Sequence, residues 1–126
     1  MKRESVDGKT LETWTAQELH EALEAREAVL IDVRSPAEYM LGHVAGSLLM
    51  PMADFDAKAL PEEGKKRLVL MCGSSKRSEK MAHKMLSAGA ERIAHLEGGF
   101  GAWKEAKLPH IAADFPSGGQ SRVNQD

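Results

Sequence analysis

Two short apolar runs stand out from the polar residues around them and predict buried strands. They are residues 28–33 (AVLIDV) and 67–71 (RLVLM). Neither run alternates cleanly between apolar and polar positions, which is typical of strands covered on both faces, as in a parallel sheet. Residues 92–96 (RIAHL) form a weaker third run, and residues 48–49 are predicted to belong to a fourth strand.

Segments around these runs carry helix signals. Residues 15–18 and 35–38 are capping boxes, in which a hydroxyl and a glutamate satisfy backbone N–H groups reciprocally. A third helix is predicted from about residue 78 to residue 87, where apolar residues recur at helical spacing. A last helix follows the pair Gly98-Gly99 and ends before Pro109. Strands that alternate with helices predict an α/β fold with a largely parallel sheet.

The ends of the chain are expected to be loose. Residues 1–12 are polar and are predicted to form a flexible arm, and residues 112–126 form a polar tail that contains glycine and proline. The folded body is therefore expected at residues 13–111. The whole chain of 126 residues has the length of one domain, and its 42% hydrophobic and 29% charged residues fit a globular protein.

Charge and cysteine content exclude several classes of function. The 17 basic and 19 acidic residues give a net charge of −2, which argues against a general nucleic-acid binder. We find no apolar run near the roughly 20 residues that span a bilayer, and no secretory signal at the N-terminus. The single cysteine excludes an internal disulfide framework, and a free thiol fits a reducing compartment, most simply the cytoplasm.

The segment after the second apolar run carries the strongest chemical signal. Cys72 stands at the end of the strand, where ligands bind in open parallel sheets. It is followed by six small or basic residues: Gly73, Ser74, Ser75, Lys76, Arg77 and Ser78. A short loop that enters a helix turns backbone N–H groups inward and forms an anion-binding nest. The small residues leave room for that curl, and the two basic residues add positive charge.

A thiol in such a nest ionises readily, because amides and cations solvate the thiolate. The thiolate is the nucleophile, and the same nest can hold a persulfide, which is also an anion at neutral pH. A lone cysteine after an apolar strand is more often an inert core residue. An inert residue does not need a polar and basic loop directly behind it, so we interpret Cys72 as reactive.

Three motifs in the right order resemble the rhodanese family of single-domain sulfurtransferases, from about residue 15 to residue 109. The family's active loop reads Cys, four residues, Arg, then Ser or Thr, which matches residues 72–78. Its first motif is an Asp-x-Arg at the end of a strand, followed by a helix start and Gly-His, and it matches residues 30–51. Its late Gly-Gly before an aromatic helix matches residues 97–103.

The resemblance implies a three-layer α/β/α fold with a mostly parallel sheet of about five strands. It also implies a sulfurtransferase that moves a sulfane sulfur from thiosulfate or a similar anion to cyanide or a thiol, through a Cys72 persulfide. Backbone amides of residues 73–78 would cradle the persulfide, and Lys76 and Arg77 would attract the donor. No metal or organic cofactor is implied, and a protein could serve as the sulfur acceptor.

One loop position departs from the family pattern. The family loop often has glycine three residues after the cysteine, where this chain has Ser75. If that position requires a positive φ, serine is strained there and the loop curls differently. Gly73 is unusual at its own position and could compensate. The departure concerns turnover and donor preference more than the identity of the nucleophile.

Two other functions are compatible with a cysteine in an anion nest. Cell-cycle phosphatases and some arsenate reductases have five residues between Cys and Arg, which widens the cradle for a tetrahedral anion. The four residues between Cys72 and Arg77 make a tighter ring that suits a single sulfur atom. The second alternative is a relay or binding module that carries a persulfide between protein partners with little turnover of its own.

Other polar residues near the motifs are interpreted as structural. Asp32 and Arg34 are expected to form an ion pair or hydrogen-bond lock, because a buried charge must be paired. His43 is expected to be a turn residue rather than a general base. The remaining histidines have no ligand spacing with Cys72 or with one another, so no zinc site is predicted. They are His20, His83, His95 and His110.

Overall fold

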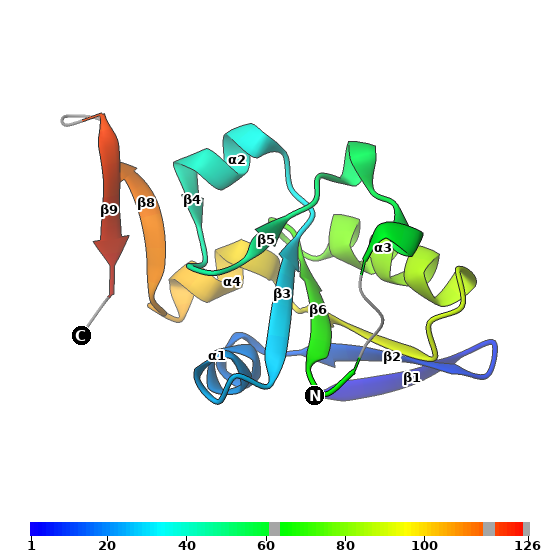
Figure 1. Ribbon diagram of the computed structural model, residues 1–126. Helices are drawn as coiled ribbons and strands as arrows, with labels where there is room; N and C mark the ends of the chain where they lie inside the picture. The colour runs from blue at the N-terminus through cyan, green and yellow to red at the C-terminus, as the bar shows by residue number, and fades with distance from the viewer. Residues whose placement is uncertain (61–63, 115–117, 125–126) are drawn as a thin grey trace.

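A computed structural model describes residues 1–60, 64–114 and 118–124, and its central element is a mixed sheet (Figure 1). Within these residues the main sheet has six strands rather than the expected five or so. In spatial order they are β1 (Lys2–Val6), β2 (Lys9–Trp14), β7 (Arg92–Leu96), β6 (Arg67–Met71), β3 (Ala28–Asp32) and β5 (Leu48–Leu49). All neighbours in this order are parallel except β1 and β2, which confirms the mostly parallel sheet.

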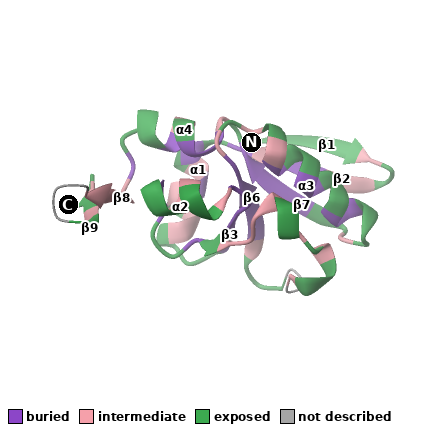
Figure 2. Ribbon diagram, turned by 90° about the horizontal axis from the view of Figure 1, so that it is seen from above, coloured by how far each residue is buried: buried purple, intermediate pink, exposed green. Residues whose placement is uncertain are grey.

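Helices cover both faces of the sheet. On one face, α1 (Ala16–Glu24) and α4 (Gly99–Glu105) bury Leu19, Phe100 and Trp103 against the strands. On the other face, α3 (Lys76–Ser87) buries Met81 and Met85, beside the 3₁₀ turns η1 (Met52–Asp54) and η2 (Ala57–Ala59). The central strands between them are almost wholly buried (Figure 2). The arrangement is the three-layer α/β/α fold that the resemblance implies.

A smaller unit extends from the carboxyl edge of the main sheet. Helix α2 (Pro36–Leu41) leads directly into the short strand β4 (Gly42–His43), which pairs with β8 (His110–Asp114) and through it with β9 (Gly119–Val123). Figure 1 shows β8 between β4 and β9, with β9 on the outer side, away from the main sheet. The unit places α2 next to the ends of β3 and β6, where the candidate nucleophile lies.

The expectation of a flexible arm at residues 1–12 is wrong. These residues form a hairpin, and β2 extends the main sheet by pairing in parallel with β7. The turn is Asp7-Gly8, with φ of 50° and 80°, as in a two-residue hairpin that needs two positive φ values. Tertiary contacts hold the hairpin on the main sheet, because Leu11 packs in the core and the buried carboxylate of Glu12 binds Arg67.

The expectation of a loose tail from residue 112 is also wrong for the residues described. Residues 110–114 and 119–123 pair as antiparallel strands, and Gly42 and Ala112 are opposite one another across β4 and β8. Apart from buried His110, their residues are partly buried in β8 and mostly exposed in β9, so backbone pairing contributes more than core packing to their order. Within the described ranges, each helix is too short or too polar to cross a membrane.

Candidate active site around Cys72

Cys72 lies directly after β6, at the carboxyl edge of the sheet. Its side chain is 1% exposed and borders the apolar cluster under α3. The next residues turn sharply into α3, which begins at Lys76. The predicted order of buried strand, short polar loop and helix is therefore present, and the positive end of a 12-residue helix adjoins the thiol.

Backbone amides of the loop converge on the sulfur. The Ser75 N–H donates to Sγ at 3.1 Å. Burial alone raises the pKa of the Cys72 thiol, but hydrogen bonds from the backbone of Ser78, Ser74 and Ser75 and the contact between Sγ and the Ser78 hydroxyl outweigh it, so the pKa is lower than usual. A lowered pKa increases the share of thiolate near neutral pH. Cys72 is thus buried beside aliphatic residues and still has the amides aimed at it.

Ser75 has the positive φ that the family's glycine at this position suggests. Its φ is 112°, in a region that residues with a Cβ rarely occupy. The side chain has a compensating contact, because the Ser75 hydroxyl accepts a hydrogen bond from the Gly98 N–H at 2.6 Å. The strained position therefore both directs an amide at Sγ and anchors the loop to the turn before α4.

The Gly98-Gly99 turn fits closely against the loop. The Phe100 N–H donates to the Cys72 carbonyl at 2.8 Å, and the Gly101 N–H donates to the Gly73 carbonyl at 3.1 Å. A Cβ on Gly99 would stand 2.6 Å from the Gly73 carbonyl carbon, closer than side chains pack. The late glycine pair in the sequence is therefore needed where the start of α4 packs against the loop after Cys72.

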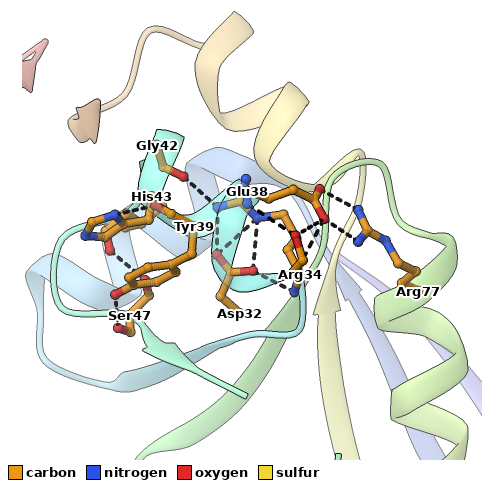
Figure 3. A network of polar contacts seen from close by, with 10 residues as sticks. Asp32, Arg34, Glu38, Tyr39, Gly42, His43, Ser47 and Arg77 are labelled. Atoms are coloured by element: carbon orange, nitrogen blue, oxygen red, sulfur yellow. Dashed lines mark hydrogen bonds and ion pairs between the residues drawn. The ribbon is translucent and has the colours of Figure 1, made fainter. Parts of the chain in front are cut away.

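Arg77 does not extend freely toward solvent. Its guanidinium binds both carboxylate oxygens of Glu38 in α2, at 2.7 and 2.8 Å (Figure 3). Hydrogen bonds from Arg77 lower the pKa of Glu38 to about 2. The guanidinium also lies 3.1 Å from the place where a Cβ on Gly73 would stand, so glycine at position 73 leaves room for it. Lys76, in contrast, is exposed at the start of α3.

Asp32 and Arg34 form the lock that the sequence predicts. Asp32 is fully buried, and its carboxylate accepts from the Arg34 side chain at 2.8 to 3.1 Å and from the Arg34 N–H at 3.0 Å. Arg34 also donates to the Gly42 carbonyl at 2.7 Å (Figure 3). Its guanidinium carbon lies 4.4 Å from the ring centre of Phe100. These contacts join β3 to β4 and α4. The Asp32 and Arg34 side chains therefore bind other groups of the protein, as a structural pair does.

His43 is likewise engaged within its own turn. Its Nδ1 is 2.9 Å from the Tyr39 carbonyl, and its ring stacks on the Tyr39 ring with centroids 3.9 Å apart (Figure 3). The Tyr39 hydroxyl donates to the Ser47 carbonyl at 2.8 Å. The contacts agree with the structural role expected for His43.

One histidine to which the sequence analysis assigns no role lies close to the candidate nucleophile. His95 in β7 is 3% exposed, and its Nδ1 is 3.2 Å from the Ser78 hydroxyl, which is 3.6 Å from Cys72 Sγ. Its Nε2 is 3.2 Å from the Thr13 hydroxyl. No spacing in the sequence indicates this cluster, because it depends on β7 lying between β6 and β2. The order of the strands would have been the only signal.

Comparison with known families identifies the scaffold. The model of the family described as Rhodanese-like domain matches residues 15–106. The chain is 25% identical to a rhodanese-related protein from Thermoplasma volcanium, whose crystal structure superposes with a TM-score of 0.70 over 79% of this chain and 96% of that one.

Two curated relatives match the chain, and one of them is named for an activity. An uncharacterised protein of Synechocystis sp. is 41% identical over 66% of this chain and 46% of its own length. The thiosulfate sulfurtransferase GlpE of Pseudoalteromonas translucida is 28% identical over 68% of this chain and 82% of its own length. The chain thus spans less than half of the first of these relatives and most of the second.

Proposed function

This chain belongs to the rhodanese-like domain family, and we propose that it is a sulfurtransferase that carries a sulfane sulfur as a persulfide on Cys72. The observation that carries the proposal is the set of backbone amides around Sγ, with the Ser75 N–H at 3.1 Å. Backbone N–H groups that converge in this way stabilise an anionic sulfur by hydrogen bonding. The relative named a thiosulfate sulfurtransferase supports the same reading.

In the proposed reaction, the Cys72 thiolate attacks the outer sulfur of thiosulfate. A bond forms between Sγ and that sulfur, the bond to the sulfonate group breaks, and sulfite leaves with the electron pair. Cyanide or a thiolate then attacks the terminal sulfur of the persulfide. The Sγ–S bond breaks, its electron pair returns to Cys72 as thiolate, and the acceptor departs as thiocyanate or as a new persulfide. Neither step needs an external oxidant or reductant.

Access to the sulfur requires movement, because Cys72 is 1% exposed. Arg77 is held beside Gly73 by Glu38, close to the loop that the donor must approach. We expect an anionic donor to compete with Glu38 for the guanidinium and so to open the approach to Sγ. Exposed Lys76 adds positive charge at the same helix end, where it attracts the anion.

The acceptor and the compartment belong to this proposal as well. A small thiol, cyanide or a cysteine of another protein can receive the sulfur by the same displacement. A free thiol nucleophile works only while it stays reduced, which favours the cytoplasm. The four residues between Cys72 and Arg77 favour a single sulfur over a tetrahedral phosphate as the bound group.

Intact-mass spectrometry after treatment with thiosulfate tests the proposal. The wild-type protein is expected to gain the mass of one sulfur atom, and cyanide is expected to remove it with release of thiocyanate. Cys72→Ser is the matched control, since it replaces only the sulfur atom, and it is expected to gain nothing. Sulfur transfer that survives in Cys72→Ser would exclude the mechanism, and a loaded protein that reacts slowly with cyanide but quickly with a protein thiol would identify a relay.

A further inference from the structure

The Ser78 hydroxyl stands at a junction between the nucleophile and a buried histidine. Its oxygen lies 3.6 Å from Cys72 Sγ, 3.0 Å from the Ser75 carbonyl and 3.2 Å from His95 Nδ1. Ser78 is fully buried, so water does not compete for these contacts. A hydroxyl has one proton and two lone pairs, and its partners therefore determine to which of them it donates.

His95 is placed to determine that direction. Burial lowers the pKa of His95, so the ring is neutral near pH 7 and carries its proton on one nitrogen. The Thr13 hydroxyl lies 3.2 Å from Nε2 and can donate to it, which leaves the proton on Nδ1, facing Ser78. In that tautomer His95 donates to the Ser78 oxygen and the Ser78 proton is free for another acceptor.

We propose that His95 is a positioning residue, which holds the Ser78 hydroxyl so that it donates a hydrogen bond to the anionic sulfur of Cys72. The inference rests on the proposed function, in which that sulfur is the carrier. With a neutral thiol, the S–H donates to the Ser78 oxygen and the Ser78 proton turns to the Ser75 carbonyl. With the thiolate or the persulfide anion, the Ser78 proton turns to the sulfur. His95 donates to Ser78 in both states.

Two substitutions at position 95 separate this role from simple packing. Asparagine places its amide near the position of Nδ1 and keeps a donor for Ser78, whereas glutamine reaches toward the position of Nε2 and keeps a partner for Thr13. In the full chain, Cys72 is the single thiol, so ultraviolet absorbance of the thiolate reports it alone once a Cys72→Ser blank is subtracted. The titration needs no sulfur donor, so its result stands whether or not the chain transfers sulfur.

We expect His95→Gln to move the titration midpoint to higher pH and to slow alkylation by iodoacetamide at neutral pH about two- to tenfold, the range for one lost hydrogen bond. His95→Asn is expected to stay close to wild type. Thr13→Val is expected to give a smaller shift in the same direction as His95→Gln. It leaves His95 and Ser78 in place but removes the hydroxyl that favours the His95 tautomer with its proton on Nδ1.

Other titrating groups stay in place in these variants. The charged and titratable groups that act on the His95 ring come from β1, α3 and the turn after β7, and they are Glu4, Glu79, His83 and Glu97. Arg77 acts on the Cys72 thiol. His83→Asn is the control, since it removes an exposed neighbouring imidazole with no bond to Ser78, and it is expected to leave the midpoint unchanged.

The Ser78→Ala background completes the test. Ser78→Ala alone is expected to raise the midpoint, and adding His95→Gln to it is expected to have no further effect, because the two residues act through one contact. Equal midpoints for His95→Gln and His95→Asn, or additive effects of Ser78→Ala and His95→Gln, would overturn the inference. Far-ultraviolet circular dichroism identifies any variant that does not fold, and in that case the Thr13→Val midpoint decides.

Discussion

Two polar segments leave adjacent strands at the same edge of the sheet and do different work. Asp32 at the end of β3 is opposite Met71 at the end of β6, so the lock and the active loop start one residue apart in register. In the lock, Asp32 and Arg34 satisfy each other and the Gly42 carbonyl. In the loop, backbone amides of Ser74, Ser75 and Ser78 converge on a sulfur atom instead of a carbonyl.

The difference lies in what the donors face. Charged groups that are fully paired inside the protein have no capacity left for a ligand, and removing one of them leaves the other buried and uncompensated. Amides that converge on a titratable thiol can stabilise whichever anion occupies that point. A motif rich in charge therefore indicates structure in one segment, while a motif of small residues indicates chemistry in the next.

The largest effect on stability is expected at the lock. Arg34→Met retains the length of the side chain but leaves Asp32 buried without its cation, and we expect a loss of about 3 to 5 kcal/mol in the free energy of unfolding. Urea denaturation measures it. At a low temperature that keeps the variant folded, thiosulfate should still load Cys72.

The double variant Asp32→Asn with Arg34→Met is the control for this prediction. Removing both charges is expected to cost less than the sum of the two single changes, because no charge is left unpaired. If Arg34→Met were as stable as wild type but no longer accepted sulfur, Arg34 would belong to the chemistry, and the contrast between the two segments would fail.

A smaller effect is expected at Ser75 in the loop. Ser75→Ala keeps the Cβ at a φ of 112° and loses the hydroxyl contact with Gly98, whereas Ser75→Gly loses the contact but relieves the backbone. We expect Ser75→Gly to be more stable than Ser75→Ala by about 1 kcal/mol. Thermal or urea unfolding compares them, and equal stabilities would show that the backbone is unstrained.

Sulfur loading should survive in both Ser75 variants. The group that donates to Sγ at this position is the backbone N–H, which either substitution retains. Intact mass after thiosulfate treatment checks it. Loss of loading in a folded Ser75→Gly protein would mean that the hydroxyl, rather than the amide, is what the sulfur needs.

The smallest effect is expected from acid at the Glu38–Arg77 pair. Arg77 holds the pKa of Glu38 at about 2, below the usual 4.5, so the folded state favours the ionised carboxylate. The contribution of the pair is therefore complete above about pH 4.5 and is lost as the pH falls toward 2. Partial exposure of both side chains limits its size.

Comparison with Glu38→Gln measures this contribution. The difference in melting temperature between wild type and Glu38→Gln is expected to be constant near neutral pH and to shrink below about pH 4.5. A difference that stays constant down to pH 2 would contradict it. The same variant also tests how the donor reaches Cys72. Without the Glu38 carboxylate, Arg77 should bind thiosulfate more readily, so the KM for thiosulfate is expected to fall.

The sequence by itself determined the features that depend on neighbouring residues. The capping boxes at Thr15 and Ser35 form as expected, since each involves residues three apart. The parallel sheet follows from apolar runs that do not alternate, and the position of Cys72 between a strand and a helix follows from their order. The identity of the candidate nucleophile therefore needed no tertiary information.

Only the tertiary structure decided which distant residues meet that nucleophile. Glu38 with Arg77, Gly98 with Ser75 and His95 with Ser78 are pairs from separate elements, brought together by strand order and register. The predictions for the two ends of the chain are wrong for a similar reason. Asp7-Gly8 is a local signal for the first hairpin, but the pairing of β2 with β7 and of β8 with β4 joins residues far apart in the chain, which no local pattern encodes.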